Sequence, residues 1–529
     1  MNAAEFDCEV AVVGCGPVGA IAANLFGQAG LRTLVIEREA APYPLPRAVH
    51  IDHEMMRIFQ SAGLAQAVLP LMREAHGHIH IGADGGVIRY LGSKGLPKRF
   101  GWANDYFFFQ PELEAAMVEG LARFAHVALR RGAGLTALEQ TPDSVTLTLA
   151  DARAVTARYV VACDGANSFV RKALGIALDD MQFHEPWLVV DAEVDGPITF
   201  PDFSGVPAGA ELSHLSVMLC DPQRPATLVP GRRNHRRWEF MLLPGERDDA
   251  MMQPAIVEAL VAPYVRNARS RVIRAATYRF HGLVAERWQS ERVFLAGDAA
   301  HQTPPFFGQG MCHGFRDVAN LAWKLKAVLR GGADPRLLES YQPERAPHVR
   351  AVIEAAIGAG RYICERDPAA AAKRDAALRA AMGKPVVASA SDLIPPLRAG
   401  VVDPSGAPGT GARFIQPYVA YRGRRTLLDD ATGGGFVLLA SSPGVLHGLS
   451  DAQRGSLDRL GVRVFAIDDA SGVSAALSDD TGDLAAWFAA HDAAAVMLRP
   501  DFYVYGTARD AGTLASLIEN LRAALAPTA

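Results

Sequence analysis

Three glycines near the N-terminus, Gly14, Gly16 and Gly19, have the GxGxxG spacing with which a backbone binds a pyrophosphate. The first glycine permits a tight turn, the second lets phosphates approach the backbone, and the third lets a helix pack on a strand. Glu37 ends the apolar run RTLVI about 20 residues later, where a carboxylate binds a ribose hydroxyl. Because strand, helix and acid accompany the glycines, the pattern predicts a dinucleotide site.

Two further elements lie far away in the sequence and supply what a flavin dinucleotide needs once its adenosine end is anchored. Val161–Arg171 reads VACDGANSFVR, and Arg292–Met311 reads RVFLAGDAAHQTPPFFGQGM. The apolar strand over 159–162 delivers Asp164 to the first of these elements. Together with the glycine turn, they predict bound, non-covalent FAD.

The elements around these motifs predict an α/β protein built on a Rossmann-type FAD-binding domain. Short β-type runs separated by Pro and Gly turns follow this domain, and they predict an inserted β-sheet that could form a wall of a small-molecule pocket. The predicted domains are 1–180, the first part of the FAD-binding domain; 181–278, a substrate-binding β-sheet domain; 279–365, the second part of the FAD-binding domain with a helix; 366–411, a helix and linker; and 412–529, a C-terminal domain.

The C-terminal domain has its own α/β pattern. Gly435–Ala440, Val462–Ile467 and Ala494–Arg499 are strand candidates, and Thr513–Ala526 has the pattern of an amphipathic helix. The domain resembles a thioredoxin-like module that lacks the redox CxxC. We therefore expect it to have a structural or oligomeric role, and a homodimer is a possible assembly.

The composition excludes several other classes of protein. The chain has 529 residues, of which 50% are hydrophobic, and its net charge of −4 offers no basic surface for nucleic acid or an anionic membrane. No apolar stretch is long enough to span a membrane and no secretory signal is evident, so a cytoplasmic location is expected. The six cysteines are scattered without metal-ligand spacing, which predicts reduced thiols and no metal site.

These motifs make the chain similar to the class A flavoprotein aromatic hydroxylases, the group that contains p-hydroxybenzoate hydroxylase and phenol hydroxylase. The resemblance covers essentially the whole chain, and the DPxRP motif points to the 3-(3-hydroxyphenyl)propionate hydroxylase branch. It rests on GxGxxG, Pro46-Arg47-Ala48, Gln110-Pro111, DGxxSxVR over Asp164–Arg171, DPQRP over Asp221–Pro225 and GDAAH over Gly297–His301.

The resemblance implies a set of cofactor contacts. Asp298 would accept a hydrogen bond from a ribityl hydroxyl, and the glycines of Gly308-Gln309-Gly310 would bring amides to the flavin edge that becomes negative on reduction. Arg47 and Gln110 would contact the cofactor, and Asp164 would serve NAD(P)H use as well as FAD. The predicted cofactor-binding residues are Gly14, Gly16, Gly19, Glu37, Arg38, Arg47, Gln110, Asp164, Gly297, Asp298, Gly308, Gly310 and Met311.

The implied reaction uses NADH or NADPH to reduce FAD, then O₂ to form a C4a-hydroperoxide that transfers one oxygen to a phenolic ring. The pocket needs an apolar wall that excludes water and one group that accepts the phenol proton. No second GxGxxG lies between a strand and a helix, which agrees with transient binding of the nicotinamide donor in this family. The sequence does not decide between NADH and NADPH.

The candidate catalytic residues are His50, Asp52 and Pro305. His50 has the pKa range of a proton relay, although a structural loop histidine is an alternative reading, and Asp52 is a second candidate base. Arg224, between prolines, is the candidate partner of a substrate carboxylate, and a solvated hairpin charge is the alternative. The candidate substrate-binding residues are Arg224, Phe306, Phe307 and His50.

Other functions remain open at this point. A flavin-dependent halogenase is disfavoured because its WxWxIP signature is absent. An oxidase that releases hydrogen peroxide, or a non-catalytic dinucleotide-binding protein, would also carry a dinucleotide fold. The motifs favour the hydroxylase, and the expected partners are O₂ and a small aromatic compound that bears a carboxylate.

Overall fold

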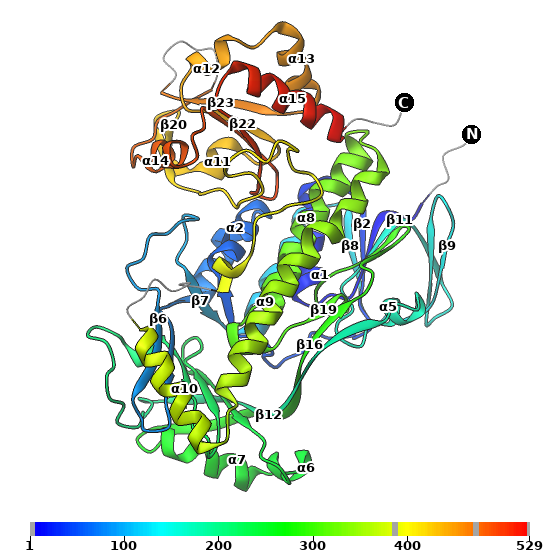
Figure 1. The fold of residues 1–529 in the computed structure, drawn as a ribbon. Coiled ribbons are helices and arrows are strands. Elements are labelled where there is room, and N and C mark those ends of the chain that lie inside the picture. Colours follow the sequence, from blue (N-terminus) through cyan, green and yellow to red (C-terminus); the bar gives the residue numbers. More distant parts are fainter. Residues whose placement is uncertain (1–5, 383–389, 469–474, 526–529) are drawn as a thin grey trace.

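The chain was analysed as a computed structural model that describes residues 6–382, 390–468 and 475–525. Figure 1 shows the C-terminal domain (orange and red) at one end, a β-sheet with α6 and α7 at the other, and the long helices α8 and α9 running between them. Part of the predicted linker, 383–389, and the end of the predicted last helix, residue 526, lie outside the described residues.

The first sheet carries the glycine turn. Its order is β17-β18-β11-β1-β2-β8, with β10 and β9 continuing from β11, and β1 pairs in parallel with both of its neighbours. Every residue of β1 is buried, as expected of a central parallel strand covered on both faces. The bounds are β1 (Cys8–Val13), β2 (Thr33–Ile36), β8 (Val127–Arg130), β9 (Leu135–Gln140), β10 (Val145–Leu149), β11 (Ala154–Ala162), β17 (Gln289–Ser290) and β18 (Val293–Leu295).

Helices cover this sheet and run past it toward the other parts of the molecule. Helix α1 follows β1 and contacts α8, which in turn contacts α9. The bounds are α1 (Pro17–Gln28), α2 (His53–Ser61), α3 (Ala65–Val68), α4 (Gln110–Glu119), α5 (Phe169–Ala173), α8 (Gly310–Arg330), α9 (Tyr341–Ile363) and α10 (Pro368–Ala381).

The second sheet has the order β19-β16-β12-β15-β14-β13-β5-β6. The prediction placed 77–92 in the first part of the FAD-binding domain, but in the structure β5 and β6 extend this sheet, because β5 pairs in parallel with β13. The bounds are β5 (Gly77–Ile81), β6 (Val87–Gly92), β12 (Leu178–Asp195), β13 (Ser216–Leu219), β14 (Ala226–Val229), β15 (His235–Met241), β16 (Arg269–Ala285) and β19 (His301–Gln302), and α6 (Asp248–Met251) and α7 (Pro254–Val261) follow β15.

A small third sheet connects the two large ones. Its order is β3-β7-β4, formed by β3 (His50–Asp52), β7 (Asp105–Phe108) and β4 (Met72–Ala75). The antiparallel pairing of β3 with β7 places His50 opposite Phe107 and Asp52 opposite Asp105. This pairing brings His50 next to β7, the strand that precedes the Gln110-Pro111 motif.

The C-terminal domain is a five-stranded mixed sheet of order β24-β23-β22-β25-β26, together with a two-stranded hairpin. One face of the sheet packs on α13 and α15 and the other on α11 and α14. All six cysteines precede this domain, so no CxxC can lie in it. The bounds are β20 (Tyr418–Tyr421), β21 (Arg424–Leu427), α11 (Leu428–Thr432), β22 (Val437–Ala440), α12 (Gly444–His447), α13 (Asp451–Arg459), β23 (Arg463–Ile467), β24 (Ala475–Leu477), α14 (Asp483–Ala490), β25 (Ala495–Leu498), β26 (Val504–Ala508) and α15 (Ala511–Leu525).

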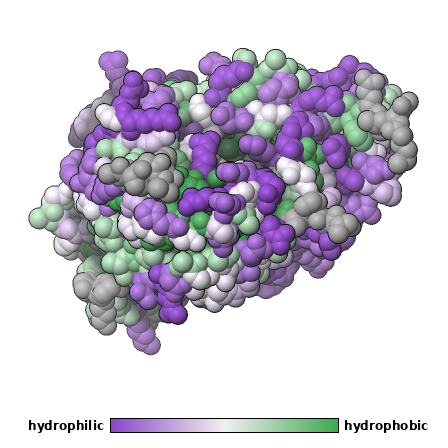
Figure 2. All heavy atoms as spheres, turned by 90° about the horizontal axis from the view of Figure 1, so that it is seen from above, coloured by the Kyte–Doolittle hydropathy of each residue, from purple (hydrophilic) through white to green (hydrophobic). Residues whose placement is uncertain are grey.

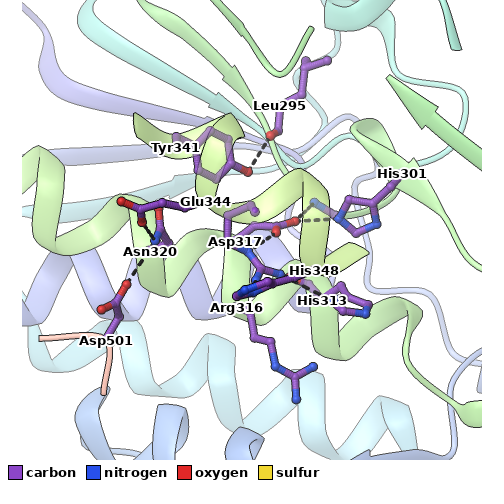
Figure 3. Close-up of polar contacts among 12 residues, drawn as sticks. Leu295, His301, His313, Arg316, Asp317, Asn320, Tyr341, Glu344, His348 and Asp501 are labelled. Atoms are coloured by element: carbon purple, nitrogen blue, oxygen red, sulfur yellow. Dashed lines mark hydrogen bonds and ion pairs between the residues drawn. The ribbon is translucent and has the colours of Figure 1, made fainter. Parts of the chain in front are cut away.

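A buried ionic cluster joins the C-terminal domain to the two long helices. Glu344 on α9 contacts Arg499 at 2.6 Å and Lys324 of α8 at 2.9 Å, and it accepts a hydrogen bond from Asn320 at 2.6 Å. Figure 3 shows Asn320 between Glu344 and Asp501. Burial alone would raise the pKa of Glu344, but the two cations lower it overall, so the carboxylate stays ionised.

The surface seen from the side of the C-terminal domain is mostly hydrophilic, with smaller hydrophobic areas between the polar residues (Figure 2). Within the described ranges, no helix combines the length and the apolar character that crossing a membrane requires.

We predict that Glu344→Gln lowers the free energy of unfolding by about 3–5 kcal/mol, because it leaves two buried cations without their shared carboxylate. Urea denaturation followed by tryptophan fluorescence tests this, since Arg499 lies over the Trp323 ring at 5.1 Å. Glu339→Gln on an exposed position is the matched control and should change stability by less than about 0.5 kcal/mol. Equal midpoints for the two variants would show that the cluster does not hold the domains together.

Candidate functional site

In the glycine turn between β1 and α1, neighbouring atoms leave no room for a side chain at two of the glycines. The third glycine has free space next to its backbone. Gly14 has a φ of +95°, and a Cβ there would lie 2.5 Å from the Cys163 carbonyl oxygen. A Cβ on Gly19 would lie 1.9 Å from the carbonyl oxygen of Gly14. At Gly16 the nearest atom is a guanidinium nitrogen of Arg47 at 4.0 Å, so this backbone remains accessible.

Glu37 lies beside this turn at the end of β2. One of its carboxylate oxygens accepts a hydrogen bond from the backbone N–H of Cys15 at 2.7 Å, and the other accepts from the N–H of Glu39 at 2.8 Å. The acid and the glycine turn are therefore fixed to each other. Arg38 instead pairs with Glu39 on the surface, where its side chain is 75% exposed.

The loop that contains Arg47 is held from two sides. The side-chain oxygen of Gln110 accepts from the backbone N–H groups of Arg47 at 2.9 Å and Ala48 at 2.5 Å. From the second sheet, Arg237 donates to the carbonyl oxygens of Pro46 at 3.0 Å and Arg47 at 2.5 Å. Gln110 thus fixes the loop through its side-chain oxygen, its contact with the cofactor stays a prediction, and Arg237 is a positioning residue that the motifs did not reveal.

The DGxxSxVR motif contacts the GDAAH motif through its arginine. Arg171 donates to the carbonyl oxygens of Ala299 at 3.0 Å and Ala166 at 2.9 Å. Asp164 accepts from the N–H of Val170 through Oδ2 at 3.0 Å, whereas its buried Oδ1 has no hydrogen-bond partner among the described residues. Burial raises the pKa of Asp164 above the usual range of an aspartate.

Asp317 on α8 organises the GDAAH loop (Figure 3). Its carboxylate accepts from the N–H of Gly297 at 3.1 Å, from His301 Nε2 at 2.7 Å and from Arg345 Nε at 2.9 Å. The next residue of the loop, Asp298, is exposed between buried neighbours. The surroundings raise the pKa of Asp298 above the usual range of an aspartate, and the charges of His301 and Arg47 partly offset this shift.

The loop after GDAAH is anchored by one aromatic side chain and lies open on its other side. Phe306 is buried, with ring centroids 5.9 Å from Phe183 and 6.0 Å from both Trp187 and Phe280. The Phe306 ring is therefore part of the core, and its contact with a substrate stays a prediction. Pro305 and Phe307 on either side are half-buried.

The other end of this loop contacts the predicted base. Gly308 has a φ of +62°, and a Cβ built on it would lie 2.6 Å from His50 Nδ1. His50 Nε2 contacts Asp105 Oδ1 at 2.9 Å, and the buried Nδ1 has no hydrogen-bond partner among the described residues. An Nε2–H donated to a carboxylate leaves Nδ1 as the acceptor, so the free nitrogen faces the loop.

Two other predicted residues do not have the roles that the sequence suggested. Asp52 caps α2 by accepting from the N–H of Glu54 at 3.0 Å, and its other oxygen contacts Arg316 at 2.6 Å. Burial would raise the pKa of Asp52, but Arg316 lowers it overall, so this carboxylate is a poor base. Arg224 contacts Glu246 at 2.5 Å, which already compensates its charge.

One cluster has the residue types of a metal site. His76, Glu211 and His214 place their ligand atoms within 4.8 Å of one another. Lys94 contacts Glu211 at 2.6 Å, and burial together with the charge of Arg73 lowers the pKa of His214. This positive surrounding opposes a metal cation, so we assign no metal to the cluster.

Comparisons with known proteins identify the family of the chain. The chain matches the FAD binding domain family over residues 7–356 and the HcaD C-terminal domain over 411–524. It is 37% identical to a probable NADH-specific resorcinol 4-hydroxylase of Rhodococcus jostii (strain RHA1), with 98% of this chain and 95% of the relative covered. The chain belongs to this family of FAD-dependent hydroxylases.

Two further comparisons cover almost the whole chain. A 3-(3-hydroxy-phenyl)propionate/3-hydroxycinnamic acid hydroxylase of Burkholderia cenocepacia (strain HI2424) is 36% identical, with 95% of this chain and 94% of the relative covered. The structure of the flavin-dependent monooxygenase PieE in complex with FAD and substrate has a TM-score of 0.82 and 25% identity, covering 99% of this chain and 100% of that chain. These comparisons confirm the predicted fold, an FAD-binding domain with an inserted β-sheet.

The residues present at the site fit FAD. The accessible backbone at Gly16 precedes the N-terminus of α1, where amides and the helix dipole favour a pyrophosphate. Asp298 offers an exposed carboxylate, and a Cβ on Gly310, the first residue of α8, would meet no atom within 4 Å. These open positions lie on two of the three motifs that predicted the cofactor, the glycine turn and Arg292–Met311.

We predict that Gly16→Ala weakens FAD binding about tenfold or more, equivalent to about 1.4 kcal/mol, while changing the stability of the apoprotein by only about 1 kcal/mol. The structure has room for the methyl group and its φ of −73° suits alanine, so the loss would come from the pyrophosphate alone. Titration of apoprotein with FAD, followed by flavin fluorescence, measures the affinity.

Gly19→Ala is the comparison variant. Its Cβ would overlap the Gly14 carbonyl oxygen, so both stability and FAD affinity should fall. A Gly16→Ala protein with the FAD affinity of the wild type would show that the pyrophosphate does not bind at this turn.

Proposed function

We propose that this chain is a monooxygenase that uses NADH or NADPH, FAD and O₂ to hydroxylate a phenolic compound. The observation that carries the proposal is the free Nδ1 of His50, which faces the Gly308 loop and is oriented by Asp105. The relatives named as resorcinol and hydroxyphenylpropionate hydroxylases support a phenol as substrate. The relative named as NADH-specific supports a nicotinamide donor.

The FAD would be held by the residues of the three motifs. The glycine turn would bind the pyrophosphate, Glu37 a ribose and Asp298 the ribityl chain, while the N-terminus of α8 at Gly310 would add its dipole at the flavin edge. When bound, the flavin supplies hydride acceptance from the nicotinamide and activation of O₂ for transfer of one oxygen atom to the ring. The residues around the flavin would orient the substrate, exclude water and accept the phenol proton.

His50 would remove the proton of the phenol hydroxyl. Burial would raise the pKa of Asp105, but the hydrogen bond with His50 and the other polar groups around the carboxylate together lower it overall, so Asp105 stays ionised. This carboxylate fixes the ring orientation and leaves the Nδ1 lone pair toward the substrate side. A deprotonated phenol is the more electron-rich ring, and therefore reacts faster with an electrophilic oxygen.

Apart from Asp105, the rings that lie beside His50 carry no charge at pH 7. The His78 ring lies 5.8 Å from the His50 ring, and burial lowers the pKa of His78 to about 4, so this neighbour is neutral at pH 7. Phe107 lies 6.1 Å away on the other strand. Such a site protects a reactive oxygen species from water. Pro305, half-buried at the start of the same loop, would line the substrate side. A homodimer and a cytoplasmic location stay predictions.

We predict that His50→Gln lowers the rate of product formation at pH 7 by about 100-fold, the usual contribution of a general base. The loss should shrink as the pH approaches about 10, where a phenol ionises without help. The measurement is NADH or NADPH oxidation with a panel of phenols, in which hydrogen peroxide and the product that gains one oxygen are quantified together.

His447→Gln, at an exposed position on α12, is the matched control and should behave as the wild type. Anaerobic reduction of the flavin by NADH without substrate should also be nearly unchanged in His50→Gln. Hydroxylation by this variant within twofold of the wild type would eliminate His50 as the base. A wild-type protein that forms only peroxide with every compound would favour the oxidase.

A further inference from the structure

Glu239 lies on the face of the second sheet that is turned toward the cofactor loops. Its neighbours in sequence, Trp238 and Phe240, pack in the separate core on the other face, beneath α7. Because successive side chains of a strand alternate, Glu239 shares its face with Arg237 and Met241.

The two residues that flank Glu239 on this face connect it to both loops of the site. Arg237 donates to the carbonyl oxygens of Pro46 and Arg47. Met241 belongs to the same core cluster as Phe306, which anchors the loop from Pro305 to Gly308. Along β15, Glu239 therefore lies between Arg237, which holds the Arg47 loop, and Met241, which shares a hydrophobic cluster with Phe306.

The residues that lie next to Glu239 on the neighbouring strands carry no charge. Val189 of β12 and Thr227 of β14 lie directly opposite, and Met218 of β13 follows Thr227 in the same row. Glu239 is half-buried and forms no ion pair or hydrogen bond with another residue in the described part of the chain. Burial raises the pKa of Glu239 to about 7; the charge of Asp191 acts in the same direction, and the charges of Arg237 and Arg274 act in the opposite one.

Two arginines of this face share one carboxylate. Arg237 contacts Asp191 at 2.8 Å, and Arg274 contacts the same carboxylate at 3.2 Å. Arg89 lies on β6, four strands from Glu239, or about 19 Å along the sheet at a strand spacing of about 4.8 Å. A substrate carboxylate beside Glu239 would meet a second acid there, and the like charges would repel each other.

We propose that Glu239 is a specificity residue that accepts a hydrogen bond from a second hydroxyl or amino group of the aromatic substrate. The preferred substrate is then a phenol with this second donor and without a carboxylate at that position. This inference rests on the proposed hydroxylase function, and it replaces the expectation of a carboxylate held by Arg224. A site that binds a substrate hydroxyl through a buried acceptor rejects analogues that lack it, because the acceptor is left unpaired.

The test compares three ligands on the FAD-loaded enzyme: phenol, 1,3-dihydroxybenzene and 3-hydroxybenzoate. Their dissociation constants are measured from the change in flavin absorbance, and their conversion from the oxygenated product. The wild type should bind the dihydroxybenzene about tenfold or more tighter than phenol, and should bind the hydroxybenzoate most weakly.

Glu239→Gln keeps the shape of the side chain and removes its charge. This variant should weaken the dihydroxybenzene about tenfold and tighten the hydroxybenzoate about tenfold, with the FAD content unchanged. Glu193→Gln, at the end of β12 where Glu193 contacts Arg271, is the matched control and should alter none of the three. A general loss of folding would weaken the binding of both ligands, so opposite changes in the two dissociation constants would show a specific effect of Glu239.

Two outcomes would overturn the assignment while the hydroxylase function stands: unchanged constants for all ligands in Glu239→Gln, or a wild type that hydroxylates 3-hydroxybenzoate in preference to 1,3-dihydroxybenzene. The second needs no variant, so the proposal stays testable if Glu239→Gln fails to fold. A wild type that oxygenates no phenol of any kind would overturn the proposed function and this inference with it.

Discussion

The arrangement of the site depends on one buried carboxylate, that of Asp317. Three donors from different parts of the chain meet it: the Gly297 N–H, His301 and Arg345. Burial would raise the pKa of Asp317, but His301 and Arg345 lower it overall, so the group is an anion inside the protein. Removing one partner from a buried charge is costly, and the carboxylate thus fixes the loop to α8 and α9 together. Because Gly297 is held in this way, Asp298 next to it can point to the accessible side.

A second constraint couples the inserted sheet to the cofactor loop. Asp191 holds Arg237, and Arg237 in turn holds the carbonyl groups of Pro46 and Arg47. Gln110 holds the N–H groups of the same loop from the opposite side. The backbone around Arg47 is thus hydrogen-bonded through both its donors and its acceptors, which leaves the guanidinium as the mobile part. The substrate-side sheet and the flavin-side loop therefore cannot move independently without breaking buried hydrogen bonds.

The sequence was sufficient for the fold class and the cofactor, because glycine spacing and acids at strand ends are local signals. It was insufficient where strand pairing supplies a partner from a distant segment: Asp105 reaches His50 only because β7 pairs with β3. The role of Asp52 was readable, since an aspartate just before a helix is a strong N-cap. Glu246, which occupies Arg224, lies 22 residues further along the chain, and no motif connects the two.

Two acids on one sheet face illustrate how the same fold treats structural and functional charges differently. Asp191 has His235, Arg237 and Arg274 around it, and although burial acts in the other direction these partners lower its pKa to about 2. Glu239 lies one row away, without such a partner, and burial raises its pKa to about 7. Its ionisation therefore costs folding free energy as the pH rises toward 7, since the folded pKa exceeds the unfolded one. Asp191 has three protein partners on this face, whereas Glu239 has none among the described residues, so the half-buried carboxylate of Glu239 is left as an acceptor for a ligand.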